Sequence, residues 1–349
     1  MIEIKRLCVD LGEFVLNDVS LSIDEGEYFI ILGPTGAGKT VLLESIAGLN
    51  PIRSGELWLR GHNVTNVEPE KRHISIVYQD HVLFPHMTVK ENLLFGLKMQ
   101  HLSVEEQNEN LNWVVDLMGI DRLLHRNPET LSGGEKQKVA LGRAIITRPE
   151  LLLVDEPLSA LDPETRENVQ QELRHLHRTL GLTILHVTHD FEEAISLGTR
   201  IAVIGDGRLM QEGTPEEIFR HPNSEFVARF AMTRNIFQGT AKRKADGSTV
   251  FRVNDTEFVI AVELEGSRHA SIRPEDILIS SEPLRSSARN CFPATITNVL
   301  DRGSTLYITA DIPPELSCLV TRQSFQEMEL QEGKKVYLTF KASSIHLFD

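Results

Sequence analysis

Residues 33–40 read GPTGAGKT, and this stretch decides the fold of the 349-residue chain. It fits the pattern GxxxxGK[ST], in which glycine-rich backbone N–H groups surround phosphates, a lysine meets the terminal phosphates and a hydroxyl meets Mg²⁺. A loop of this kind predicts an α/β core. The expected phosphate contacts are the residues of the loop and its successor: Gly33, Pro34, Thr35, Gly36, Ala37, Gly38, Lys39, Thr40 and Val41.

Two further stretches fit a nucleotide site. Residues 151–157 read LLLVDEP, an apolar run typical of a buried parallel strand that ends in two adjacent acids. Because side chains alternate along a strand, Asp155 and Glu156 are expected to point in different directions. Residues 131–135 read LSGGE, and the helix-like stretch that follows would present backbone and hydroxyl donors suited to an anion.

These motifs, in this order, resemble the ATP-binding cassette family, in which LSGG of one subunit closes over nucleotide held by the phosphate loop of a second. Three more family motifs match: Gln79 in IVYQD, SALD at residues 159–162, and His189 in HVTHD. The resemblance implies an α/β phosphate-loop ATPase core with a helical subdomain. It also implies a homodimer with ATP and Mg²⁺ as cofactors.

The resemblance assigns roles to residues of the first subunit. Thr40, Gln79 and Asp155 would support Mg²⁺, and Glu156 would polarise the attacking water. Lys39 and His189 would hold the terminal phosphates, so that positioned charge stabilises phosphoryl transfer.

Other nucleotide contacts are expected from elsewhere. Across the dimer the family pattern implies contacts from Ser132, Gly133, Gly134, Gln137 and Asp162. Family members usually stack an aromatic side chain on adenine, but the aligned region here reads DLGEFVLND. Leu11 and Phe14 are the candidates, and packing in the core is the alternative for Phe14.

Composition favours a protein that works beside a membrane without crossing it. Hydrophobic residues make up 41% of the chain, yet no uncharged apolar run reaches the roughly 18 residues of a membrane helix. The N-terminus MIEIKRLCVD lacks a signal-peptide pattern, so we expect a peripheral protein on the cytoplasmic face of a prokaryotic membrane. Cys8, Cys291 and Cys318 lack CxxC spacing and indicate plain reduced thiols.

Charge and spacing weigh against the non-transport branch of the family, which acts in DNA repair, chromosome maintenance and translation. The net charge is −14, so no basic footprint for nucleic acid is present. The stretch between Thr40 and Leu131 also lacks the sustained heptads of the long coiled coils that split the ATP motifs in the repair and chromosome proteins.

The segment after Gln79 indicates a membrane partner. It reads DHVLFPHMTVKENLLFGL, with Leu83, Phe84, Met87 and Val89 clustered beside polar residues. Such residues could form the core of the helical lobe, expected at about residues 85–150. In importer ATPases a nearly identical segment forms a groove for a short helix of the pore subunit, a known mode of recognition. The resemblance therefore implies two transmembrane permease subunits contacted through residues 83–89, served by an external solute-binding protein.

A second domain is expected to follow residue 234. The boundary is predicted at residues 235–238, NIFQ, after a first domain at 1–234. The stretches VFRVN, EFVIAV, ASIRPEDILIS, PATITNVL, TLYITADI and KVYLTFK read as short strands separated by turn residues. Such strands predict a small all-β, OB-like barrel at 235–349, resembling the regulatory domain appended to many importer ATPases.

The last part, about residues 285–349, resembles the molybdate- and tungstate-binding domain called molbindin. Three strings carry the likeness: SARN at 287–290, TRQS at 321–324 and KASS at 341–344. A tetrahedral dianion needs N–H and O–H donors with modest positive charge, and these strings supply them. The alternative is that they are turn residues of an inert barrel or dimer contact. The candidate ligands are Ser287, Ala288, Arg289, Asn290, Thr321, Ser324, Lys341, Ala342, Ser343 and Ser344.

The resemblances together imply the ATPase subunit of a molybdate or tungstate importer. Oxyanion bound in the second domain would regulate it by feedback. Sulfate, ferric iron, polyamines and sugars remain alternative cargoes, since the ATPase core does not encode cargo.

Overall fold

The computed structural model describes residues 1–349 except 81, 101, 160, 232–233, 246 and 349. The chain divides into two compact units, Met1–Pro215 and Glu216–Asp349. The division precedes the predicted boundary at 234/235, because the helical stretch at 216–230 groups with the second unit. Residues 235–238 instead begin the first strand of that unit.

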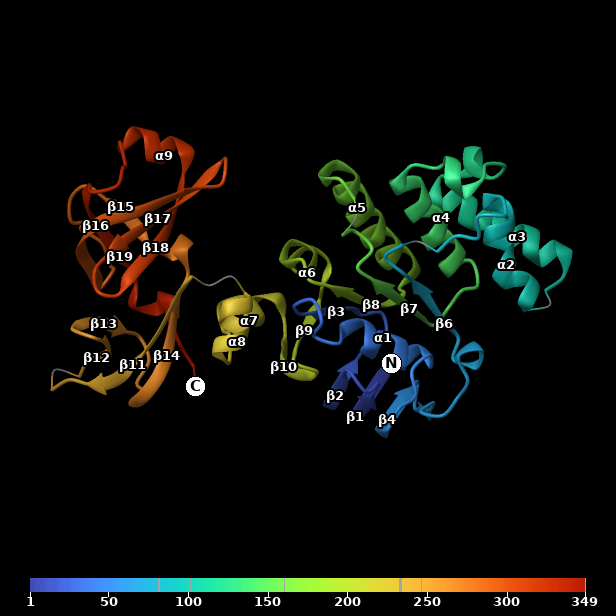
Figure 1. The fold of residues 1–349 in the computed structure, drawn as a ribbon, viewed down its shortest axis with the longest axis horizontal. Coiled ribbons are helices and arrows are strands. Elements are labelled where there is room, and N and C mark those ends of the chain that lie inside the picture. Colours follow the sequence, from blue (N-terminus) through green and yellow to red (C-terminus); the bar gives the residue numbers. More distant parts are fainter. Residues whose placement is uncertain (81, 101, 160, 232–233, 246, 349) are drawn as a thin grey trace. The chain divides into compact units, whose positions relative to one another are not determined.

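A six-stranded sheet forms the centre of the first unit (Figure 1). Its strands are parallel apart from β10, which pairs antiparallel with β9. β3 and β7 are buried along their whole length, as their apolar sequences predict. In sheet order the strands are β10 (Arg208–Gly213), β9 (Arg200–Gly205), β3 (Tyr28–Leu32), β8 (Thr183–Thr188), β7 (Leu151–Asp155) and β6 (Ile74–Val77).

A four-stranded antiparallel sheet and helix α1 (Lys39–Ala47) share one core with this sheet. Leu42 and Ile46 of α1 pack in the same buried cluster as Phe29 and Ile31 of β3. Burying a side chain of this size stabilises the fold by about 2 kcal/mol. The packed α1 fixes the phosphate loop, which runs directly from β3 into α1. The strands of the second sheet are β2 (Val15–Ile23), β1 (Ile2–Asp10), β4 (Ser54–Leu59) and β5 (His62–Asn63).

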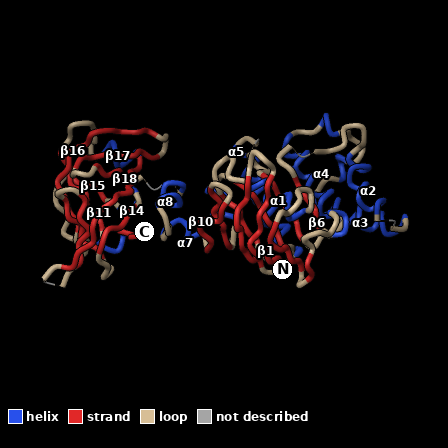
Figure 2. Tube along the Cα trace, turned by 60° about the horizontal axis from the view of Figure 1, so that its bottom comes forward, coloured by secondary structure: helices blue, strands red, loops and turns tan. Residues whose placement is uncertain are grey.

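Helices α2, α3 and α4 gather into the helical lobe beside β6, within the range predicted for it (Figure 2). Each begins with a capping box, in which Thr88, Ser103 and Ser132 exchange hydrogen bonds with a glutamate three residues later. No helix in the described part of the chain is both long and apolar enough to cross a bilayer. The helices of this unit after α1 are α2 (Val89–Met99), α3 (Val104–Met118), α4 (Gly133–Ile145), α5 (Pro163–Leu180) and α6 (Phe191–Leu197).

The second unit opens with α7 (Pro215–Arg220) and α8 (Glu225–Phe230) and continues as two five-stranded antiparallel sheets. Both sheets contribute to one core, in which Phe258 meets Phe292 and Phe340. The first sheet contains β13 (Thr256–Ile260), β12 (Thr249–Val253), β11 (Asn235–Arg243), β14 (Gly266–Ile272) and β20 (Ile345–Phe348). The second contains β15 (Leu278–Ser280), β19 (Lys335–Phe340), β16 (Asn290–Asp301), β17 (Thr305–Asp311) and β18 (Glu315–Thr321).

The strands differ from the sequence prediction in two ways. The run ASIRPEDILIS is not one strand, because a short 3-10 helix at Pro274–Asp276 separates β14 from β15; a proline cannot donate to a sheet ladder. The prediction also omits β11, which begins at the residues taken as the domain boundary, together with β18, β20 and helix α9 (Arg322–Glu327).

Candidate functional site

The phosphate loop lines a pocket of about 380 Å³ in the first unit. The pocket lies where β3 and β7 end and α1 begins, a place where the N-terminus of a helix favours anions. Motifs far apart in sequence meet there. Its lining residues are Phe14, Thr35, Gly36, Gly38, Lys39, Thr40, Val41, Gln79, Asp155 and Glu156.

Lys39 is held inside its own loop. Its Nζ donates to the carbonyl oxygens of Gly33 at 2.9 Å and Pro34 at 3.0 Å, and lies 3.5 Å from Oε1 of Glu156. Burial lowers the pKa of Lys39, and the neighbouring Glu156 carboxylate partly offsets this effect. The ammonium therefore lies where a phosphate entering the loop would meet it.

Asp155 and Thr40 form a pair of oxygen donors on one side of the pocket. Oγ1 of Thr40 donates to the Asp155 carboxylate, at 3.0 Å from Oδ2 and 3.2 Å from Oδ1. Burial raises the pKa of Asp155, and the hydrogen bond from Thr40 opposes that effect. A hydroxyl and a carboxylate beside the Gln79 amide make an oxygen set of the kind that Mg²⁺ prefers.

Glu156 contacts a different set of partners, as the alternation of side chains predicts. Its Oε2 lies 2.9 Å from Nδ1 of His189, and its Oε1 faces Lys39. Glu156 has φ of 42°, a left-handed conformation that redirects the chain directly after β7. His189 follows β8, so neighbouring parallel strands bring the two side chains together.

Phe14 both lines the pocket and packs on the phosphate loop. A Cβ at Gly38 would lie 2.3 Å from the Phe14 ring, and Gly38 has φ of 97°. Only glycine meets both demands at this position. Phe14 also packs against the core between the sheets, so packing and adenine stacking remain compatible for this residue.

The residues expected to contact nucleotide across a dimer lie outside this pocket. Ser132 caps α4, where its Oγ accepts from the Glu135 N–H at 3.3 Å. Asp162 caps α5 and accepts from the Thr165 N–H at 3.1 Å, and the Thr165 side chain together with this N–H lowers the pKa of Asp162. Between these caps Gly134 approaches Thr165 so closely that a Cβ would lie 2.9 Å from its methyl group. Ala160 of the SALD run lies outside the described residues.

Gln137 is placed differently from the expected contact. Its side chain is fully buried, and neither amide atom has a hydrogen-bond partner. Gln137 therefore does not face the surface on which Ser132 begins α4.

The segment expected to meet a membrane partner is organised by Asn92, which the sequence analysis missed. Asn92 is fully buried; its Oδ1 accepts from Phe84 N–H at 2.8 Å, and its Nδ2 donates to carbonyl oxygens of Phe84, Met87 and Thr88. Leu83, Phe84 and Met87 are partly exposed, whereas Val89 is buried in the lobe. An asparagine within the apolar run ENLLFGL is the signal that could have identified this scaffold.

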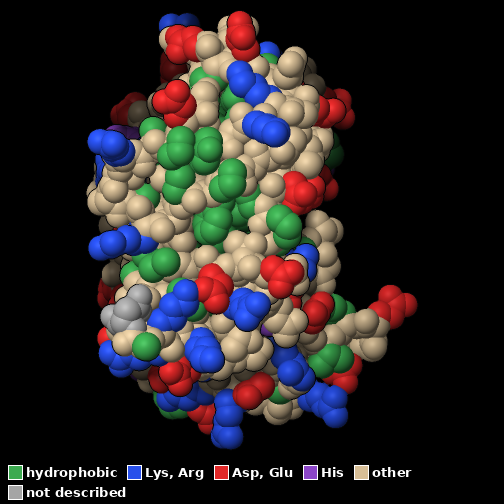
Figure 3. Space-filling model, turned by 90° about the vertical axis from the view of Figure 1, so that its left-hand side faces the viewer, with side chains coloured by type: hydrophobic (Ala, Val, Ile, Leu, Met, Phe, Trp, Pro, Cys, Tyr) green, Lys and Arg blue, Asp and Glu red, His purple; other side chains and the backbone are tan. Residues whose placement is uncertain are grey.

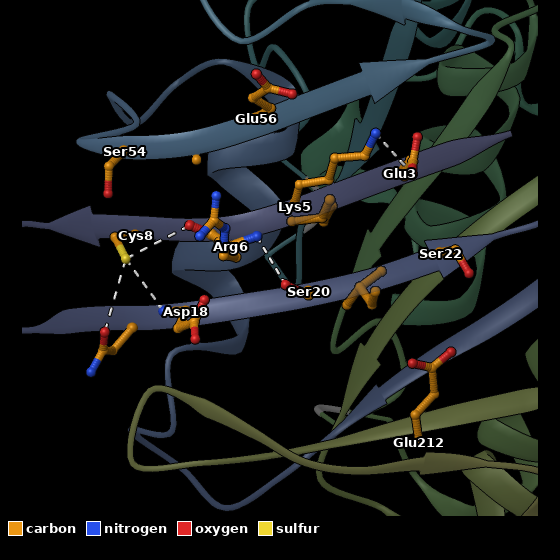
Figure 4. Close-up of a pocket in the computed structure, with 14 residues that line it drawn as sticks. Glu3, Lys5, Arg6, Cys8, Asp18, Ser20, Ser22, Ser54, Glu56 and Glu212 are labelled. Carbon is orange, nitrogen blue, oxygen red and sulfur yellow. Dashed lines mark hydrogen bonds and ion pairs between the residues drawn. The ribbon is translucent and has the colours of Figure 1, made fainter.

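A larger hollow of about 1140 Å³ lies on the outer face of the four-stranded sheet (Figure 4). No residue of the phosphate loop lines it. Within it Lys5 and Glu3 lie 3.0 Å apart and partly neutralise one another. The hollow is unrelated to the nucleotide pocket despite its size.

In the second unit the β16–β19 ladder brings two of the predicted anion-binding strings together. Asn290 pairs with Phe340, so SARN lies beside KASS, with Arg289 and Lys341 exposed. The Asn290 side chain itself is buried and exchanges two hydrogen bonds with the backbone of Val259, at 2.8 and 2.9 Å. The expectation that Asn290 offers its amide to an anion therefore does not match this structure.

The third string, TRQS, lies at the other end of β16. Thr305 pairs with Thr321, and Arg322 forms an ion pair with Asp301 at the C-terminal end of that strand. Oγ1 of Thr321 accepts from the Ser324 N–H at 3.2 Å and thereby caps α9. One chain therefore does not gather all three strings at one place.

The fold and pocket define a class of protein. The ABC transporter family matches residues 16–159, and the TOBE domain matches residues 286–347. The dimeric post-hydrolysis structure of the ATP-binding cassette MJ0796 with ADP and Pi superimposes with a TM-score of 0.55 and 31% identity, covering 62% of this chain and 99% of that chain. The chain belongs to the ATP-binding cassette family and is an ATPase of the ABC transporter type.

Within the family, one group of relatives matches the chain from end to end. The molybdate/tungstate import ATP-binding protein WtpC of Pyrococcus abyssi is 43% identical over 100% of both chains, and so is that of Pyrococcus horikoshii. The spermidine/putrescine import ATP-binding protein PotA of Haemophilus influenzae is 37% identical over 97% of this chain and 94% of its own.

Proposed function

We propose that this chain is the ATP-hydrolysing subunit of an importer for molybdate or tungstate. The observation that carries the proposal is the end-to-end likeness to the archaeal molybdate/tungstate import proteins, which includes the second unit. The order of identities, 43% against 37% for the polyamine import protein, favours oxyanion cargo over polyamine cargo.

The chemistry of the pocket supports hydrolysis of ATP with Mg²⁺. Thr40, Gln79 and Asp155 would hold the metal, which supplies charge that stabilises the phosphates. Lys39 would bind the terminal phosphates. Glu156, which lies 2.9 Å from His189, would orient and polarise the attacking water, and His189 would hold the terminal phosphate against it.

A second copy would complete each nucleotide site. Ser132, Gly133 and Gly134 lie at the start of α4 and do not line the pocket of their own chain. The Ser132 N–H is held by the Glu135 carboxylate at 2.8 Å, so the backbone N–H groups of Gly133 and Gly134 at this helix start are the ones that suit the terminal phosphate of a nucleotide held by another copy. The dimeric structure of the related ATP-binding cassette with ADP and Pi supports the pairing of two copies.

The partners would be two membrane subunits, which place the chain at the cytoplasmic face of the membrane. An external solute-binding protein would deliver the cargo to them. Support comes from residues 83–89, where Asn92 holds a loop with partly exposed apolar side chains. Gln79 precedes this loop and also lines the pocket, so a partner helix and nucleotide could both act on it.

The second unit would bind the imported anion and slow the ATPase. SARN and KASS lie together in one chain whereas TRQS lies at the far end of β16, so a site containing all three would draw on two copies. Figure 3 shows hydrophobic side chains gathered on one face of this unit, a feature typical of interaction surfaces. A tenfold preference of the anion for the non-hydrolysing arrangement corresponds to about 1.4 kcal/mol of coupling.

Calorimetric titration of the full-length chain tests the proposal. We expect heat on binding molybdate or tungstate, at least tenfold weaker binding of sulfate, and none of spermidine. The double variant Lys341→Ala, Ser343→Ala should weaken molybdate binding, and Lys335→Ala at the opposite end of β19 should not. Binding of spermidine, or of no oxyanion at all, contradicts the assignment of cargo.

A further inference from the structure

A row of buried polar side chains lies behind the turn that carries His189. Oη of Tyr28, on β3, lies 3.0 Å from Nδ1 of His186, on β8. Nε2 of His186 lies 3.4 Å from Oε2 of Glu193, on α6, and Oγ1 of Thr188 donates to the same carboxylate oxygen at 2.7 Å. Tyr28, His186 and Glu193 are at most 2% exposed. None of them lines the nucleotide pocket.

Burial and neighbouring groups shift the pKa values of Tyr28 and Glu193. Burial raises the pKa of Tyr28 well above its ordinary value, so its hydroxyl keeps its proton within hydrogen-bond distance of Nδ1 of His186. The other ring nitrogen of His186, Nε2, faces the Glu193 carboxylate. Burial raises the pKa of Glu193, but the contacts with His186 and Thr188 outweigh it and leave that pKa below its ordinary value. Glu193 is therefore a buried carboxylate that remains charged.

The Thr188 hydroxyl connects this carboxylate to the backbone around His189. While it donates to Glu193, its oxygen accepts from the Asp190 N–H at 3.0 Å. Asp190 in turn accepts from the N–H groups of Glu192 at 2.7 Å and Glu193 at 3.1 Å, which begins α6. The backbone is thus fixed on both sides of His189 by one hydroxyl.

A buried charge of this kind is costly, and apolar packing could replace it without loss of stability. We propose that Tyr28, His186 and Glu193 position His189 for catalysis, through the Thr188 hydroxyl. These are positioning residues, since none of them lines the nucleotide pocket. The inference rests on the proposed role of His189 at the terminal phosphate. The three buried residues would keep the His189 imidazole beside Glu156. A displacement of about 1 Å at such a position can lower the rate up to a hundredfold.

The test compares two substitutions of the same kind on one strand. Thr188→Val removes the hydroxyl at the His189 end of β8. Thr183→Val removes a buried hydroxyl at the other end, where Thr183 accepts from the Gly26 N–H at 2.9 Å. Both changes leave a backbone N–H without its partner, and Thr188→Val also removes the donor to the Glu193 carboxylate, so Thr188→Val should lower Tm more than Thr183→Val. We measure kcat and KM for ATP with the full-length chain, together with Tm.

We expect Thr188→Val to lower kcat roughly tenfold, with KM within about twofold of the native value. Thr183→Val should leave kcat within about twofold, and Thr188→Ser, which keeps the hydroxyl, should restore it. Equal kcat for the two valine variants overturns the inference, and so does an effect on KM alone. If Thr188→Val does not fold, Glu193→Gln and Tyr28→Phe replace it. Losses of kcat that diminish in that order support the inference, and unchanged kcat in both overturns it.

A spectroscopic measurement separates this inference from the proposed role of His189. The protein is prepared with ¹³C-labelled histidine rings, and the NMR resonance of the His189 ring is assigned from its loss in His189→Ala. We expect Thr188→Val, but not Thr183→Val, to shift or broaden it. If His189→Ala keeps full ATPase activity, the role of His189 at the phosphate fails, while the ring signal still decides whether Thr188 positions it. An unchanged ring signal overturns the positioning.

Discussion

At the scale of single residues, two adjacent carboxylates are separated by their contacts. Asp155 accepts from Thr40 on one side of the pocket, and Glu156 meets Lys39 and His189 on the other. Because their partners differ, substitution of each acid to its amide should have a different consequence.

Glu156→Gln should retain ATP binding and reduce hydrolysis at least a hundredfold, since the amide keeps the shape of the side chain but cannot accept a proton from water. The variant should therefore accumulate as an ATP-bound dimer. Steady-state ATPase assays and gel filtration with ATP check both expectations. Hydrolysis close to the native rate would remove Glu156 from its proposed role.

Asp155→Asn should increase the stability of the nucleotide-free chain while it reduces Mg²⁺-dependent hydrolysis more than tenfold. Because burial raises the pKa of Asp155, the charged carboxylate destabilises the folded chain at pH above its folded pKa. This cost fades as the pH falls through that pKa, so the gain in unfolding free energy should be largest near pH 8 and smaller in acid.

Chemical unfolding at several pH values measures the difference between Asp155→Asn and the native chain. Asp116→Asn, an exposed carboxyl on α3, serves as the control. A gain that grows as the pH is lowered contradicts the assigned direction of the pKa shift.

At the scale of elements, Asn92 of α2 holds the loop at residues 83–89, which is expected to contact the membrane subunits. Asn92→Leu keeps the size of the side chain but removes its hydrogen bonds to Phe84, Met87 and Thr88. We expect a loss of about 1–3 kcal/mol in unfolding free energy, because buried backbone groups are left without partners. Binding to the membrane subunits should weaken, while ATP binding by the isolated chain stays unchanged.

The matched control is Asn110→Leu on α3, whose amide donates one exposed hydrogen bond to the Glu106 carbonyl at 2.9 Å. Unfolding titrations and co-purification with the membrane subunits compare the two variants. If both behave alike, Asn92 does not organise the segment.

The sequence predicts these elements unevenly, for physical reasons. The buried run 151–155 and the phosphate loop are local signals, so the strand, the loop and the helix after it follow from a few residues. The burial of Gln137 and the row of buried polar side chains from Tyr28 to Glu193 depend on contacts between distant segments, which no local pattern encodes. The strand β18 was missed because Pro313 and Pro314 just before it favour a turn.

At the scale of the whole molecule, the arrangement of half-sites is the main consequence of the fold. The nucleotide pocket and the LSGGE motif of one chain do not form one site, and the TRQS string lies at the opposite end of β16 from SARN. The sequence supplies each half-site as a string. Only the strand register shows that one chain brings SARN and KASS together and keeps TRQS apart from them.

If two copies share each ATP site, a mixture of two inactive variants should regain activity. Lys39→Ala damages the phosphate loop, and Ser132→Arg places a large cation where α4 begins. In a heterodimer both defects fall on the same site and leave the other intact. We therefore expect each homodimer to be inactive, and the heterodimer, isolated with two different affinity tags, to hydrolyse ATP at roughly half the native rate or less. A tag-purified heterodimer as inactive as its parents contradicts the account.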